Sequence, residues 1–237
     1  MSLTWVLLPG LDGIGRFRTL RAALSGRVLV RALSYPTGVP LDYGALLALV
    51  ESSLREEGPY CLVAESFSAP IAIRLAARRP SALRAVVFAA GFCACPLRGP
   101  LCGLLPLLPG PLLARAPSPW LVKGLFLGWR ATPDLIADVQ ASARVLDPAV
   151  VVRRLAEIRR VDVCAELQKI PVPMLYLRAR QDRIVGEHAL RAMRRHAPQL
   201  EVVELDAPHM LLQTHPHAAI AAIRAFLARH GLEAPLV

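Results

Sequence analysis

The sequence predicts an α/β fold in which a mainly parallel sheet is covered by helices on both faces. Short apolar runs that suit buried strands alternate along the chain with helical segments, as in successive β-α-β units. A length of 237 residues also suits one domain with a substantial core. The expected strands lie near Trp5, Val28 to Leu33, Cys61 to Ala64, Ala85 to Ala89, Met174 to Leu177 and Val202 to Leu205.

Two helices are predicted most clearly by the sequence. The helix after the third strand should run from Ser68 to Arg79, because the segment is apolar except for Arg74 and Arg78, which lie four residues apart. Such a helix is largely buried, with one edge in water. The last helix should end at Gly231. Its apolar face is formed by Ile220, Ile223 and Leu227.

An insertion from about residue 93 to 169 separates two of the strands and is too long for a simple crossover. We interpret it as a helical lid on a core made of residues 1–92 and 170–237. Its first part, Pro96 to Pro119, is too rich in Leu, Pro and Gly for a long helix. Helices are expected over residues 119–127, 133–143 and 148–160, each begun by a capping side chain and a proline: Ser118-Pro119, Thr132-Pro133 and Asp147-Pro148.

Ser66 stands where a strand-like run stops and a helix begins. A serine on a tight strand-to-helix turn holds its hydroxyl out of the sheet, and the residues two before and two after it must be small. Ala64 and Ser68 meet that need, although the usual G-x-S-x-G pattern has glycine at both positions. Ser66 is therefore a candidate nucleophile. At this point it could equally be the N-cap of the following helix.

A serine nucleophile needs a general base and an acid that orients the base. His209 follows the last expected strand and is the candidate base. Asp182 follows the apolar run that ends at Arg178 and is the candidate acid, unless it forms a surface ion pair with a neighbouring arginine. Asp206, three residues before His209, is the rival acid. The remaining histidines have the placement of surface or capping residues: His188, His196, His215, His217 and His230.

A glycine-rich turn over residues 9–15 follows the first strand. It could cradle a phosphate, but it lacks both the G-x-G-x-x-G frame and a Walker lysine. We therefore interpret it as an oxyanion loop, in which the N–H groups of Leu11 and Phe67 point at the carbonyl oxygen of a substrate.

The chain order Ser66, Asp182, His209 resembles the α/β-hydrolase superfamily. The segments that look like its bacterial esterase-type members are Leu-Pro-Gly-Leu-Asp-Gly (8–13), Glu-Ser-Phe-Ser (65–68), Arg-Gln-Asp-Arg-Ile-Val (180–185) and Pro-His-Met (208–210). The resemblance covers nearly the whole chain. It implies a serine hydrolase that cleaves carboxylic esters through an acyl-enzyme on Ser66. The chain departs from the family pattern at Ala64 and Ser68, where glycine is usual, and at Pro9, where many relatives have histidine. These departures bear on substrate preference.

Two other functions stay open. One is a thioesterase or acyltransferase that uses the same three residues on acyl carriers, with a basic surface facing an acidic carrier protein. The other is a non-catalytic, ligand-binding member of the fold. The expected substrate is a small ester with a lipophilic acyl group, and no cofactor or metal is expected.

The formal net charge is +10, and Lys123 and Lys169 are the only lysines. The arginines are scattered and lack the interleaved aromatic residues of a nucleic-acid platform, so we expect a solvated basic surface and no nucleic acid. No stretch reaches the ~18 apolar residues of a membrane span. The N-terminus has no basic segment typical of a secretory signal, so we expect a cytoplasmic protein.

The cysteines are five in number, an odd count without the density of a disulfide scaffold. At this low density they suit a reducing compartment. Three of them cluster, but the spacing is not a zinc pattern and no histidine completes it. The five are Cys61, Cys93, Cys95, Cys102 and Cys164.

Overall fold

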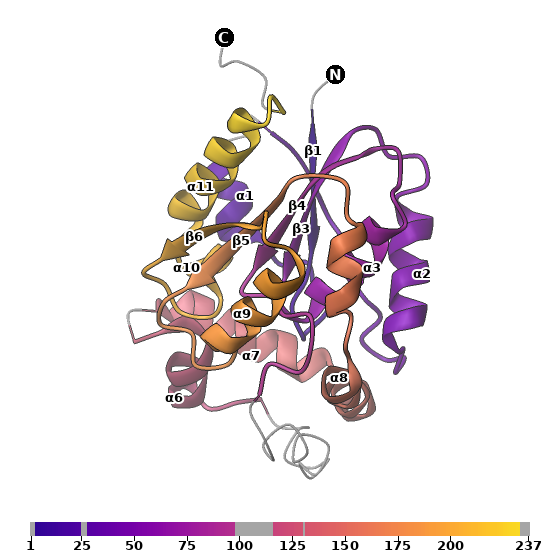
Figure 1. Cartoon of the computed structure of the whole chain (residues 1–237). Coiled ribbons are helices and arrows are strands. Elements are labelled where there is room, and N and C mark those ends of the chain that lie inside the picture. Colours follow the sequence, from indigo (N-terminus) through magenta and orange to yellow (C-terminus); the bar gives the residue numbers. More distant parts are fainter. Residues whose placement is uncertain (1–2, 25–27, 98–115, 130, 233–237) are drawn as a thin grey trace.

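The centre of the molecule is a six-stranded parallel sheet with strand order β2-β1-β3-β4-β5-β6 (Figure 1). The computed structural model describes residues 3–24, 28–97, 116–129 and 131–232. Every strand lies where the sequence predicts it, so the prediction of a parallel α/β fold is confirmed. The strands are β1 (Thr4–Leu8), β2 (Leu29–Ala32), β3 (Tyr60–Glu65), β4 (Leu83–Ala89), β5 (Met174–Ala179) and β6 (Glu201–Leu205).

Side chains of the inner strands alternate between two apolar layers. Leu62 and Val86 pack in one layer, whereas Cys61 and Ala85 pack in the other. In a strand, neighbouring side chains point to opposite faces, so a strand buried on both faces must be apolar throughout. The first layer is covered by α2 (Tyr43–Ser53), α3 (Ala69–Ala77), the 3₁₀ turn η4 (Cys164–Lys169) and α9 (Glu187–His196). The second is covered by α1 (Arg18–Leu24), α10 (Leu211–Thr214) and α11 (Pro216–Arg229).

The two helices predicted most clearly differ from their expected limits only at the ends. The helix after β3 begins as a 3₁₀ turn, η1 (Ser66–Ser68), and continues as α3 to Ala77. It stops before Arg79, which has a positive φ of 57°. The last helix ends as predicted, because Gly231 adopts the left-handed conformation that glycine tolerates (φ 66°).

The helices between β4 and β5 gather at the carboxyl ends of the strands (Figure 1). Each has the predicted cap: Ser118 accepts a hydrogen bond from Leu121 N, Thr132 from Leu135 N and Asp147 from Ala149 N. The three predicted helices are confirmed, with one irregularity and one longer end. They are α6 (Pro119–Val122), which runs on into a π-helical turn, η3 (Lys123–Leu127), then α7 (Pro133–Val145) and α8 (Pro148–Arg160). Most of the Pro96 to Pro119 segment lies outside the described residues.

A disulfide joins Cys93 and Cys164, whose Cα atoms are 4.8 Å apart. Cys95 is disulfide-bonded as well, so the expectation of reduced thiols is wrong. The pair is 71 residues apart in sequence, and only the fold brings the ends of the intervening segment together. At that point Ala94 and Asp162 form an isolated antiparallel bridge. The cysteine content therefore gives no support for a reducing compartment.

Of the other two cysteines, only Cys61 lies within the described residues. Cys61 is a buried free thiol in the middle of β3. Cys102 lies outside the described residues. Among the helices that the structure describes, none is long and apolar enough to cross a bilayer.

Glu65, the last residue of β3, buries its carboxyl group in the core. Its Oε2 accepts a hydrogen bond from Gln213 Nε2 of α10 at 3.0 Å. Its Oε1 and the amide oxygen of Gln213 are both buried without a partner in the described chain. Burial raises the pKa of Glu65 to about 7, and nearby Asp12 adds to the rise, although the hydrogen bond from Gln213 opposes it. Glu65 is therefore largely protonated in the folded protein below neutral pH.

We expect the wild type to lose stability as pH rises towards neutral, and we expect Glu65→Gln to remove this loss. Folded Glu65 keeps its proton up to about pH 7, whereas an unfolded glutamate releases it near pH ~4.3. The free energy of unfolding of the wild type should thus fall as pH rises through this window and then level off. Relative to the variant, the fall should be on the order of 3 kcal/mol. Urea unfolding of both proteins at about pH 5 and about pH 8 measures it. A difference between the two proteins that is the same at both pH values would contradict the assignment.

Candidate active site

Ser66 lies on a sharp turn between β3 and η1, with a positive φ of 45°. A non-glycine residue in this region is strained by ~1–3 kcal/mol and persists only where the surroundings hold it. Neither η1 nor α3 has a side-chain cap, so the interpretation of Ser66 as an N-cap is wrong. Its Oγ instead lies 3.0 Å from Nε2 of His209. The hydroxyl is thus held out of the sheet and against an imidazole.

The chain is crowded on both sides of this turn. Ala64 and Ser68 are fully buried. A Cβ added to Gly91, after β4, would lie only 2.7 Å from the Cβ of Ala69. The predicted need for small residues is therefore met within the turn and extends to the end of the neighbouring strand.

Ser68 does more than fill the place of a glycine. Its hydroxyl donates a short hydrogen bond to the carbonyl oxygen of Pro9, which follows β1. That bond uses its one proton, so the hydroxyl of Tyr35, 2.6 Å away, donates to Ser68 Oγ. The serine ties the turn at Ser66 to the loop after β1, a role that local sequence reasoning could not detect.

His209 and Asp182 complete a chain of contacts with Ser66. The Nδ1 of His209 lies 2.7 Å from Oδ2 of Asp182 and donates to that carboxylate, so Nε2 accepts from the serine hydroxyl. The other oxygen, Oδ1, accepts from the N–H groups of Ile184 at 2.8 Å and Val185 at 2.9 Å. Both side chains of the pair are almost fully buried. Three loops after β3, β5 and β6 thus bring together the residues that the sequence singled out.

The rival candidates lie elsewhere. Asp206 is exposed and accepts a hydrogen bond from Gln181 Nε2 at 3.1 Å, and no bond joins it to His209 in the described chain. No surface ion pair between Asp182 and a neighbouring arginine is formed within the described residues. Three of the other histidines have separate partners: His196 contacts Gln168, His215 contacts Thr214 and His230 contacts Glu201.

The glycine-rich loop after β1, which carries Leu11, contacts the segment after Ser66 through the bond from Ser68 to Pro9 O. Gly13 N donates to Gly10 O at 3.0 Å and closes the loop. Gly13 has a positive φ of 68°, and a Cβ there would lie 2.6 Å from a nitrogen of Arg154. Glycine is therefore required at this position for two reasons.

Arg154 of α8 holds the carbonyl side of this loop. Arg154 is only 2% exposed, and its guanidinium donates to Leu11 O at 2.7 Å and to Pro36 O at 3.0 Å. It also lies 5.8 Å from the ring centroids of Tyr35 and Phe67. In the sequence Arg154 is indistinguishable from the other scattered arginines, so its role could not be predicted.

Asp12, on the loop after β1, interacts electrostatically with the Arg154 guanidinium. Burial raises the pKa of Asp12, while the N–H of Ile14, the hydroxyl of Ser142 and the charge of Arg154 act in the opposite direction. Burial in turn lowers the pKa of Arg154, and Asp12 counteracts it. The loop after β1 is thus fixed by polar contacts from α7 and α8 as well as by Ser68.

Phe67 is fixed from the opposite side. Its ring stacks on Tyr43 with centroids 4.8 Å apart, and the Tyr43 hydroxyl donates to Phe67 O at 3.1 Å. Its N–H lies in the first turn of a helix, where no intrahelical acceptor is available. The N–H groups of Leu11 and Phe67 belong to the two segments that Ser68 joins.

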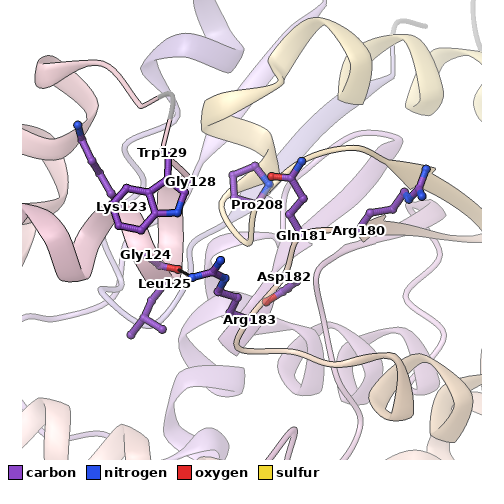
Figure 2. Close-up of a pocket in the computed structure, with 10 residues that line it drawn as sticks. All are labelled: Lys123, Gly124, Leu125, Gly128, Trp129, Arg180, Gln181, Asp182, Arg183 and Pro208. Atoms are coloured by element: carbon purple, nitrogen blue, oxygen red, sulfur yellow. Dashed lines mark hydrogen bonds between the residues drawn. The ribbon is translucent and has the colours of Figure 1, made fainter.

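A cavity of about 410 Å³ opens behind the acid (Figure 2). Asp182 and Pro208 form one side, and Gly128 and Trp129 form part of the other. Neither Ser66 nor His209 lines it. Within the part of the chain that the structure describes, no group of three or more His, Cys, Asp or Glu residues is arranged to hold a metal ion.

Comparison with known proteins places the chain in one family. Residues 5–223 match the profile of the Alpha/beta hydrolase family. A search among curated proteins finds no match. The chain is similar in structure to the enol-lactonase from Burkholderia xenovorans LB400, with a TM-score of 0.78, 18% identity and coverage of 96% of this chain and 92% of that one.

Two further solved structures are similar. For bromoperoxidase from Bacillus anthracis, the TM-score is 0.80 and the identity 18%, with coverage of 96% and 92% of the two chains. For a membrane phospholipase A described as a bacterial virulence factor, the values are 0.79 and 21%, with coverage of 96% and 79%. These likenesses agree in fold, and the family profile spans far more than half of the sequence. The chain therefore belongs to the α/β-hydrolase family.

Proposed function

We propose that this protein is a serine hydrolase that cleaves carboxylic esters. The observation that carries the proposal is the chain of hydrogen bonds from Asp182 through His209 to Ser66, with 2.7 Å and 3.0 Å between the bonded atoms. A serine paired with an imidazole, which is in turn oriented by a buried carboxylate, is the arrangement needed for acyl transfer.

In the proposed reaction, Ser66 Oγ attacks the ester carbonyl carbon as its proton passes to His209 Nε2. The tetrahedral intermediate collapses, the C–O bond to the alcohol breaks, and the alcohol leaves with the proton from His209. Water then attacks the acyl-enzyme, gives its proton to the same nitrogen, and releases the carboxylic acid as Ser66 recovers its proton. Asp182 stays ionised and holds the tautomer with a proton on Nδ1.

The N–H groups of Leu11 and Phe67 are the proposed donors to the oxyanion. The contacts of Ser68, Arg154 and Tyr43 support this role, because they fix the peptides on which the donors stand. Donors held in place before the reaction lower the barrier without reorganising during it.

We also infer that residues 93–169 act as a lid on the core formed by residues 1–92 and 170–237. Phe126 O of η3 accepts a hydrogen bond from Met210 N, next to His209, at 3.0 Å. Met210 also packs against the small apolar cluster of Val122 and Leu127. Ser66 is only 9% exposed, so the proposed ester with its lipophilic acyl group would react largely out of contact with bulk water.

Ser66→Ala should reduce the rate of p-nitrophenyl ester hydrolysis by about 10⁵-fold or more, because the nucleophile is lost. A fluorophosphonate probe should label the wild type at Ser66, as shown by peptide mapping, and should not label the variant. Circular dichroism checks that the fold is kept. Unchanged turnover in a folded variant would contradict the role of Ser66 as the nucleophile. A wild type that neither hydrolyses the ester nor reacts with the probe would instead be a binding member of the family.

Asp182→Asn should lower kcat by about 10⁴-fold, because the amide favours the wrong tautomer of His209. Asp206→Asn is the matched control, since Asp206 is exposed and bonds only to Gln181 in the described chain. Its rate should stay within a few fold of the wild type. A larger loss in the control than in Asp182→Asn would transfer the role of acid to Asp206.

Arg154→Lys should lower kcat by roughly 10- to 100-fold, because lysine cannot bridge the carbonyl groups of Leu11 and Pro36 and the oxyanion loop shifts. Arg153→Lys, on the same helix, changes a partly exposed arginine paired with Asp42 and Glu157 and is the control. Steady-state kinetics separate kcat from KM. An Arg154→Lys enzyme with the kcat of the control would show that this arginine serves stability alone.

A further inference from the structure

Four large apolar side chains on α6, η3 and the residues after them are exposed. Trp120 is 73% exposed, Leu121 48%, Leu125 36% and Trp129 55%. These four, which we call the tryptophan patch, are more than half of the seven large apolar residues exposed in the described chain. They fall within ten residues, whereas single exposed apolar residues are ordinary on a protein surface. A cluster of this kind marks an interaction surface.

The segment that carries the tryptophan patch also has buried side chains, which pack against α7. Val122 and Leu127 are buried and form an apolar cluster with Ile136 of α7. The two exposed indoles contact each other, with ring centroids 5.6 Å apart. The segment therefore has a buried apolar side and, separately, an exposed one.

Three cations surround the cavity beside this patch. Lys123 and Arg180 stand on opposite sides of it, with Arg183 between them, and Leu125 and Trp129 contribute to its lining (Figure 2). Arg183 donates to Gly124 O at 3.4 Å. None of the three cations forms an ion pair within the described residues. The carboxylate that lines the cavity, Asp182, is bonded to His209 and to two backbone N–H groups.

We propose that this surface docks on a bilayer containing anionic phospholipids. The tryptophan patch enters the interface between headgroups and acyl chains, and Lys123, Arg180 and Arg183 contact the lipid phosphates. Tryptophan suits this depth because its ring is apolar and its N–H is polar. Lysine and arginine side chains are attracted to an anionic surface, and the net charge of +10 also favours binding to it.

Charge favours a bilayer over a second copy of the chain as the occupant. In a symmetric dimer the patch would meet itself, and the three cations of one copy would face those of the other. An anionic lipid surface complements the cations and accepts the apolar side chains at once. The docking does not depend on the proposed ester hydrolysis, so binding and catalysis can be tested separately.

Sedimentation of the full chain with vesicles tests the proposal. Binding is expected to vesicles of phosphatidylcholine mixed with phosphatidylglycerol, to weaken with added salt, and to be much weaker to pure phosphatidylcholine. Trp120→Ser combined with Trp129→Ser should weaken binding by at least about tenfold. Lys123→Gln combined with Arg180→Gln should weaken it by about fivefold for each cation removed.

Two control variants match these changes elsewhere on the surface. Leu29→Ser with Val39→Ser removes exposed apolar side chains, and Arg194→Gln with Arg195→Gln removes exposed cations. Both should bind like the wild type. The proposal is overturned if the wild type does not bind the mixed vesicles, or if the tryptophan variant binds as tightly as its control. A third result would also overturn it: size-exclusion chromatography shows that the wild type is a dimer and the tryptophan variant a monomer, and the wild type does not bind vesicles.

Discussion

The sharp turn at Ser66 is the constraint on which the arrangement of the site depends. A serine with positive φ between a buried strand and a helix leaves no space for large neighbours, which explains Ala64, Ser68 and the close approach of Gly91 to Ala69. The same crowding brings the loop after β1 within reach of the Ser68 hydroxyl. Strain at one residue is thus maintained by contacts from three neighbouring segments.

The helices between β4 and β5 are held to the site by a few polar contacts. Arg154 reaches from α8 to the carbonyl groups of Leu11 and Pro36, and Phe126 O receives the N–H of Met210. A buried guanidinium without partners would be strongly unfavourable, so α8 is held where its arginine finds carbonyl acceptors near Asp12. Each contact ends on a loop that carries a residue of the proposed catalytic group, or on one adjacent to it. Movement of these helices would therefore displace the backbone at Leu11 and next to His209.

Much of this fold follows from local pattern. Apolar runs locate every strand, and a capping side chain before a proline locates the helices that begin after Ser118, Thr132 and Asp147. The candidate site could be assembled because the carboxyl ends of parallel strands meet at one edge, and Ser66 and His209 each follow such an end.

The features that the sequence did not reveal depend on contacts between distant segments. Arg154 has no local signal that distinguishes it from Arg153, and its role appears only when α8 meets the loop after β1. The contact of Ser68 with Pro9 and that of Glu65 with Gln213 are likewise non-local. Low cysteine density argued against a disulfide, yet Cys93 and Cys164 become neighbours because the chain returns after α8 to the carboxyl end of β4, where Val163 N donates to Cys93 O.

The disulfide at the base of the insertion has a consequence for the integrity of the chain. Cys93 and Cys164 enclose nearly all of the segment between β4 and β5. A single cut by a protease anywhere between these two cysteines would leave the two fragments covalently joined. The strands on either side would stay paired in the sheet, and the loops after β3, β5 and β6 would remain attached to one covalent body. A nicked molecule could thus keep its central sheet while the cut segment between the cysteines gains new chain ends.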